Sequence, residues 1–251
     1  MTAPRATALV AILATVALAL MLVARPAAAA DAPPQTVVEL FTSQGCSSCP
    51  PADKFLGELA QRPDLLALSI HVDYWDYIGW KDPFASPENT RRQRNYAEAL
   101  KLRYVYTPQM VIQGMGHATG SDRSSVLRRI AEAEAMPRLP VTVRHAEGRI
   151  EVTVAGADKG IDGGDEAAVW LAVFDRQHET AIKRGENGGR TLKYHNVVRN
   201  MMQVGTWTGK PLKLTATLAD LGGHPDGCAV IVQSVKTGRI LGAAKVALPK
   251  V

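Results

Sequence analysis

Two cysteines separated by two serines are the residues of this sequence best suited to chemistry. Cys46-Ser47-Ser48-Cys49 is a C-x-x-C pair, which can close into a small disulfide ring and reopen without large backbone movement. A thiolate is the attacking species in thiol–disulfide exchange, and a second cysteine nearby resolves the mixed disulfide intramolecularly. The same pair can instead form half of a metal site or a structural disulfide, so three uses stay open at this point.

The elements expected on either side of the pair favour the redox use. The apolar run at 36–42 is typical of a buried strand, and apolar residues from 52 to 60 recur at helical spacing. Ser47 or Ser48 can cap this helix. Cys46 would then lie at the positive end of the helix dipole, which favours the thiolate and lowers the pKa of a thiol.

The following segments complete an α/β pattern. A second buried strand is predicted over 65–72, and a strand–helix–strand unit of this length favours parallel strands. Residues 73–104 hold an aromatic segment and a basic helix that begins after Ser86. An apolar strand follows Pro108, and a further helix begins at Asp122.

The pattern changes after residue 137. Alternation of apolar and polar residues around a short turn at 141–154 predicts a β-hairpin, and apolar strands broken by Gly- and Asp-rich turns continue to the C-terminus. We therefore expect an α/β domain at 31–137 and a separate all-β, sandwich-like domain at 138–251.

The stretch 178–199 is dense in polar residues for a β domain. It predicts either a plain surface hairpin or a long hairpin whose Glu186, Asn187 and His195 face the first domain. Cys228 begins an apolar run and is expected to be a buried, inert thiol.

The N-terminus predicts export. An uncharged run from Ala6 to Ala24 follows Arg5, and small residues precede Asp31, so residues 1–30 are interpreted as a cleaved signal peptide of a periplasmic or secreted protein. A retained membrane anchor is the alternative. Removing the two arginines of this segment lowers the formal net charge from +5 to +3, which is too weak to indicate nucleic acid as a partner. No second segment reaches spanning length, so no membrane association is expected after cleavage.

The cysteine pair after one strand and Thr107-Pro108 before another make the chain resemble the thioredoxin-like superfamily. In that superfamily a cis-proline loop lies beside the cysteine pair, and its backbone receives the substrate chain. The resemblance implies that Pro108 is this cis-proline and that residues 73–104 are a helical insertion. It departs from thioredoxin in the Ser-Ser dipeptide and in Gly45, where thioredoxin has a tryptophan, so an oxidant and a reductant role both stay open.

A closer resemblance is to an exported bacterial family catalogued as domain of unknown function 1223. It is carried by the segments "VELFTSQGCSSCPPAD", "HVDYWDYIGWKDPFA", "YTPQMVIQG" and "RGENGGRTLKYHNVVR". The family has no established activity. The resemblance therefore implies a fold and a candidate site, but no substrate.

Together these features predict a thiol–disulfide oxidoreductase that needs no diffusible cofactor. Cys46 would be the attacking thiolate and Cys49 the resolving thiol, with a protein or small-molecule thiol or disulfide as substrate. The Thr107-Pro108 loop would hold an extended substrate by backbone pairing. Trp75 and Trp80 are predicted either to line the substrate groove or to pack as a lid beneath the insertion.

Two other functions are also compatible with the cysteine pair. Thiolates suit Cu(I), so Cys46, Cys49 and His71 are candidate ligands of a copper-binding protein. The chain could also be a non-catalytic envelope binding protein in which the pair is a structural disulfide. Asp53 is predicted either to assist proton transfer at Cys49 or to be a first-turn carboxylate favoured by the helix dipole.

Overall fold

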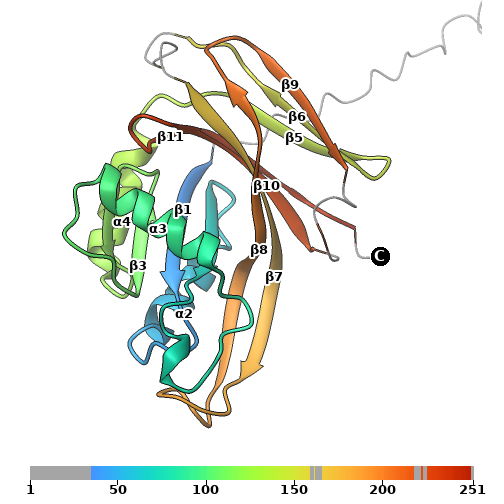
Figure 1. Cartoon of the computed structure of the whole chain (residues 1–251). Coiled ribbons are helices and arrows are strands. Elements are labelled where there is room, and N and C mark those ends of the chain that lie inside the picture. Colours follow the sequence, from blue (N-terminus) through green and yellow to red (C-terminus); the bar gives the residue numbers. More distant parts are fainter. Residues whose placement is uncertain (1–34, 159–160, 162–165, 218–221, 223–224, 250–251) are drawn as a thin grey trace, which may run out of the picture. The chain divides into compact units, whose positions relative to one another are not determined.

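The first apolar run forms the strand β1 (Thr36–Thr42), and all of its residues are buried in the computed structural model (Figure 1). The helix α2 (Pro50–Leu59) follows and buries Phe55 and Leu56 against the sheet. The strand β2 (Leu65–His71) then returns parallel to β1. The predicted strand–helix–strand unit is confirmed, with its strands parallel.

The structure describes residues 35–158, 161, 166–217, 222 and 225–249. The predicted signal peptide at 1–30 lies outside these residues. The described residues belong to one compact unit, Ala32–Val251. Within them, no helix is long and apolar enough to cross a membrane.

The start of α2 differs from the prediction. Cys49 itself is the N-cap residue, and no side chain caps the helix, so the expected capping by Ser47 or Ser48 is wrong. The first two helical positions are prolines, which have no N–H group that needs a partner. The Ser48 hydroxyl instead lies 3.4 Å from the sulfur of Cys46.

The connection from β2 to the next strand contains two helical segments. A single 3₁₀ turn, η1 (Asp76–Ile78), is followed by α3 (Pro87–Ala99). The side chain of Ser86 accepts a hydrogen bond from the backbone N–H of Asn89, as its N-cap position predicts. The helix expected in the 73–104 segment is therefore confirmed.

A buried ionic network holds α3 against the sheet. Arg92 donates to both carboxylate oxygens of Glu39 in β1, at 2.6 and 3.1 Å, and its side chain lies over the Trp170 ring. Tyr96 also donates to the Glu39 carboxylate and accepts a hydrogen bond from Gln233. The network joins α3 to strands from both halves of the chain.

Three further elements complete the N-terminal half. The strand β3 (Gln109–Ile112) pairs antiparallel with β1, and β4 (Gly116–Thr119) pairs antiparallel with β3. The helix α4 (Arg123–Glu134) begins at its N-cap Asp122, whose carboxylate accepts the N–H of Ser125. The sequence pattern does not predict the four-residue β4.

The described C-terminal half consists of strands. The predicted hairpin is formed by β5 (Val141–Ala146) and β6 (Arg149–Val154), which join β9 (Leu212–Thr217) in a three-stranded antiparallel sheet. The other four strands belong to the large sheet: β7 (Ala167–Ala181), β8 (Thr191–Trp207), β10 (Gly227–Ser234) and β11 (Ile240–Ala247).

The large sheet is mixed and has the strand order β11-β10-β7-β8-β2-β1-β3-β4. Its two halves meet where β2 runs parallel to β8, with Ser69 opposite Val197. The expected boundary after residue 137 therefore separates two halves of the chain that share one sheet.

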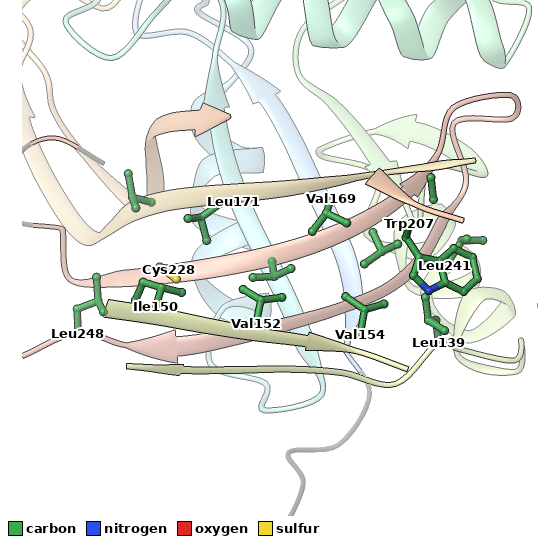
Figure 2. Close-up of a cluster of buried hydrophobic side chains, with 14 residues drawn as sticks. Leu139, Ile150, Val152, Val154, Val169, Leu171, Trp207, Cys228, Leu241 and Leu248 are labelled. Atoms are coloured by element: carbon green, nitrogen blue, oxygen red, sulfur yellow. The ribbon is translucent and has the colours of Figure 1, made fainter. Parts of the chain in front are cut away.

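The three-stranded sheet packs on the β7–β10 part of the large sheet. Figure 2 shows the apolar side chains between them, including Val152 of β6, Leu171 of β7 and the free Cys228 of β10. Trp207, at the end of β8, is fully buried here, and its indole N–H donates to the carbonyl oxygen of Ala155 at 2.9 Å. This core anchors the base of the long β7–β8 hairpin.

Candidate functional site

Cys46 and Cys49 form a disulfide at the junction of β1 and α2. Both cysteines have no exposed surface, whereas Ser47 and Ser48 between them are exposed. The two sulfur atoms are therefore covered, whereas the two serines between the cysteines are open to solvent.

The turn between β7 and β8 helps to cover the disulfide loop. Asn187 is fully buried, and its side-chain amide donates to the carbonyl oxygens of Gln44 and Cys46, at 2.9 and 3.0 Å. The carboxylate of Glu186 accepts the backbone N–H of Ser47 at 3.3 Å. Of the two interpretations of this polar stretch, the structure supports a hairpin that faces the N-terminal half. We call residues 182–190 the hairpin tip.

Trp75 lies between the disulfide loop and the Thr107-Pro108 loop. Its indole N–H donates to the Thr107 hydroxyl at 2.7 Å, and a side chain added at Gly45 would meet its Cβ and carbonyl oxygen, each at 3.2 Å. Trp75 thus occupies the space beside position 45. The Thr107-Pro108 peptide bond is cis, as the resemblance implied.

Pro108 lies close to the first turn of α2. A Cβ atom added at Gly120 would meet the side chains of both Ala52 and Pro108, at 2.9 and 3.3 Å. Trp80 contacts the disulfide loop and the hairpin tip rather than the Thr107-Pro108 loop. Its indole N–H donates to the Gln44 side chain at 2.8 Å, and it packs against Gly185 of the hairpin tip. Trp80 therefore supports the tip.

A buried polar cluster lies where α2, β2 and β8 meet. His71 Nδ1 is 2.6 Å from a carboxylate oxygen of Asp82, and both side chains have no exposed surface. The same Asp82 oxygen accepts the backbone N–H of Gln44, just before the disulfide. Asp53 accepts the Thr42 hydroxyl at 2.8 Å, and the Tyr194 ring stacks edge-on at 4.9 Å from the His71 ring.

The pKa values of the two buried carboxyl groups of this cluster, Asp53 and Asp82, are shifted in opposite directions. Burial raises the pKa of Asp53 to about 7, although the charge of His71 and the Thr42 hydrogen bond oppose the rise. Burial also favours the neutral form of Asp82, but the charge and hydrogen bond of His71 and two backbone N–H groups hold the pKa of Asp82 below its ordinary value. The cluster therefore holds one ionised carboxylate and one carboxyl group able to exchange a proton near neutral pH.

Three atoms of the cluster have no hydrogen-bond partner among the described residues: Asp53 Oδ2, His71 Nε2 and the Tyr194 hydroxyl. Buried polar atoms are usually paired, so these three are free to take part in proton movement or to bind water. Sequence reasoning did not single out Asp82 or Tyr194. Asp82 lies within a segment noted only for its aromatic residues.

The alternative metal ligands do not form a group. No set of three or more His, Cys, Asp and Glu side chains in the described part of the chain is arranged to hold a metal ion, so Cys46, Cys49 and His71 are not combined in one. His71 is engaged with Asp82 instead. Cys228 is buried as predicted, and burial raises the pKa of its thiol to about 12.

Replacing Asn187 with alanine is expected to speed reduction of the disulfide by a small phosphine by up to about thirtyfold. The change removes two hydrogen bonds that hold the hairpin tip over the loop, each worth about 1 kcal/mol, so the uncovered form becomes more populated. The rate can be followed by thiol release. The matched control Asn200→Ala, at an exposed position of β8, should react like the unchanged protein. Equal rates for both variants would show that the tip does not limit access.

Comparisons with other proteins agree with this architecture. A family model described as "Protein of unknown function (DUF1223)" matches residues 37–233. The crystal structure of a protein from Agrobacterium tumefaciens is 34% identical and covers 86% of this chain and 95% of its own, with a TM-score of 0.72. HBP35 of Porphyromonas gingivalis is similar in fold, with a TM-score of 0.59 at 12% identity, over 86% of this chain and 76% of its own. No curated protein matches.

Proposed function

Because the chain belongs to the DUF1223 family, whose description names no activity, we propose its function from the site: thiol–disulfide exchange through Cys46 and Cys49. The observation that carries the proposal is the disulfide at the start of α2, with a proton-exchanging carboxyl group four residues further along the helix. A pair that served only as a staple would not need a neighbouring carboxyl group with a pKa of about 7.

The topology supports a thioredoxin-like fold for the N-terminal half. The order β2-β1-β3-β4, with β1 and β2 parallel and β3 antiparallel, is the arrangement expected of that fold. The cis Thr107-Pro108 bond directly before β3 is in the position that the superfamily uses to receive a substrate chain. The segment 73–104 would be the insertion.

Each residue of the site has a role in this proposal. A substrate thiolate attacks Cys46, the mixed disulfide forms there, and Cys49 leaves as a thiolate. Asp53, protonated over part of the neutral range, gives a proton to Cys49 and takes it back when the disulfide re-forms. The Ser48 hydroxyl, 3.4 Å from the Cys46 sulfur, stabilises the thiolate of Cys46 when it is released.

We also propose that the protein works in the periplasm or outside the cell. The predicted signal peptide supports export, and disulfides persist in oxidising compartments. In such a compartment the Cys46–Cys49 pair can cycle without a dedicated cofactor, because its substrate supplies or accepts the two electrons.

Replacing Cys49 with serine is expected to trap mixed disulfides between Cys46 and cellular partners, because the resolving thiol is gone. These adducts should be visible on non-reducing gels and should disappear on reduction. The matched variant Cys46→Ser should trap few or none. Equal trapping by both variants would contradict the assignment of Cys46 as the attacking and Cys49 as the resolving cysteine.

The complete burial of both sulfurs favours a second candidate, a binding protein in which the disulfide is only structural. The reduction potential of the pair separates the two functions. A potential above about −300 mV supports exchange, whereas a value far below it marks a structural disulfide and would overturn the proposal.

A further inference from the structure

A cleft of about 480 Å³ lies between α2 and the first part of β8, next to the disulfide. Pro50, which directly follows Cys49, lines one end of it, and Asp53 lines it one turn further along the helix. The ring of His195 lies against Gly57, where an added Cβ atom would be only 2.5 Å from the ring. The lack of a side chain at Gly57 therefore lets β8 approach the helix closely at this cleft.

The lining of the cleft carries more positive than negative charge. Lys54 and Arg190 line it, and neither forms a close ion pair in the described part of the chain, although Arg123 and, to a smaller extent, the charge of Lys54 lower the pKa of Glu58. Glu58 also lines it, but its carboxylate is bonded to Arg123 at 2.6 Å. Lys193 is 3.7 Å from Glu179. Two cations are therefore left to attract an anionic ligand.

One of these cations is connected to the cover of the disulfide. Arg190 donates to the side-chain oxygen of Asn187 at 2.8 Å, while the amide nitrogen of Asn187 donates to the carbonyl oxygens of Gln44 and Cys46. An anion bound at Arg190 would thus lie one side chain away from the contact that holds the hairpin tip closed. Asn187 therefore contacts both the cation that would bind the ligand and the loop whose sulfur atoms must be uncovered.

We propose that this cleft binds the anionic group of a small thiol or disulfide, such as a carboxylate, sulfonate or phosphate, and so selects the substrate of the exchange reaction. The inference rests on the proposed function and narrows its substrate class. A small molecule fits because the cleft has the volume of a small-ligand site. A negative group fits because neither Lys54 nor Arg190 forms a close ion pair with an acidic side chain of the described residues.

The reaction balances with two molecules of thiol. The thiolate of the first attacks Cys46, which forms a mixed disulfide and releases Cys49 as a thiolate that takes up a proton. The thiolate of the second attacks the substrate sulfur of the mixed disulfide, which releases Cys46. The two substrate molecules leave as one disulfide, and their two electrons reduce the protein pair. In the reverse direction, an anionic disulfide is reduced.

The test is a series of small thiols that differ in charge: 2-mercaptoethanesulfonate, 2-mercaptoethanol and cysteamine. The rate of reduction of the Cys46–Cys49 disulfide is measured for each at low salt and corrected for thiolate concentration. We expect the sulfonate to react at least about tenfold faster than the neutral thiol, because each cation contributes about fivefold. Cysteamine should be slowest, and salt should reduce the differences.

The double variant Lys54→Gln/Arg190→Gln should lose most of this preference. Arg144→Gln/Lys213→Gln is the matched control, because it removes the same charge from exposed positions on β5 and β9. The control should keep the preference. Equal corrected rates for the three thiols, or equal loss in both double variants, would overturn the inference.

A binding measurement separates this inference from the proposed function. Ethanesulfonate has no thiol, so titrating it into the oxidised protein tests the cleft without any exchange. Shifts of the backbone amide signals at positions 54 and 190 and of their neighbours, absent in the double variant, support the cleft as an anion site. If these shifts occur but the reduction potential marks a structural disulfide, the result contradicts the proposed exchange reaction and still supports the anion site. If no shift occurs, the cleft proposal fails whatever the potential.

Discussion

At about pH 8, replacing Asp53 with asparagine is expected to raise the free energy of unfolding by up to about 4 kcal/mol. The folded protein raises the pKa of this carboxyl from 3.8 to about 7, mainly by burial. Between these values the unfolded chain releases the proton and the folded protein keeps it. Each pH unit in this window therefore destabilises the folded state by about 1.4 kcal/mol, and the penalty is complete above about pH 7.

Asparagine removes the penalty because it has nearly the same shape and cannot ionise. Its side-chain oxygen can still accept the Thr42 hydroxyl. Chemical denaturation across the pH range is the measurement. The gain should be largest at about pH 8 and should fall below about 1 kcal/mol near pH 4, where the carboxyl keeps its proton in the folded state and much of it in the unfolded chain. A gain that is independent of pH would contradict the assigned pKa.

If the proposed exchange takes place, the same variant should react more slowly, by about a hundredfold at neutral pH, because Cys49 loses the group proposed to give and take its proton. Rates measured with one thiol across pH should also lose their inflection near pH 7. A more stable but slower protein is the pattern of a residue kept for chemistry at a cost to the fold. A carboxyl group with only a structural role would not slow the reaction.

Replacing Arg92 with methionine is expected to lower the free energy of unfolding by about 3–5 kcal/mol. The change leaves the carboxylate of Glu39 buried without its positive partner, since the Glu39 side chain has no exposed surface. Tyr96 and Gln233 would lose bonds in the same network. Unfolding in urea, followed by tryptophan fluorescence, measures the loss.

The neighbouring arginine supplies a matched control. Arg91 pairs with Glu88 at the surface, where both side chains are mostly exposed, so Arg91→Met should change the stability by less than about 0.5 kcal/mol. A second test replaces both buried partners, with Arg92→Met and Glu39→Leu together. This double variant should recover much of the loss, because no charge is left unpaired. Equal effects of the Arg91 and Arg92 variants would contradict the account of the network.

The elements with strong local patterns could be predicted from the sequence. The continuous apolar runs of β1 and β2, the helical spacing between them and the serine before α3 each specify their own structure over a few residues. The C-x-x-C spacing makes a Cys46–Cys49 disulfide one of three predicted uses of the pair, and the cis bond at Pro108 is implied by the resemblance rather than by a local pattern. By contrast, "GHAT" in β4 has neither alternation nor an apolar run, and its strand forms only because β3 supplies a partner.

The cover of the disulfide could not be predicted with equal certainty because it depends on distant contacts. Residues 182–190 are mostly polar and resemble a surface turn, and Asn187 is buried only because the loop before Cys46 lies opposite it. Asp82 likewise looks like an exposed turn residue between Lys81 and Pro83. Its partner His71 lies 11 positions earlier, in a different element. Such pairs become visible only when the strand order is known.

The long β7–β8 hairpin limits how this protein can be divided. Its base is fixed by Trp207 in the core between the two sheets, and its tip carries the asparagine bonded to the disulfide loop. Moving residues 31–137 into another protein as a portable redox module would take both cysteines along and leave their cover behind. The unit that surrounds the disulfide is thus longer than the segment that contains the two cysteines, and gene fusions or truncations should keep the chain intact through β8.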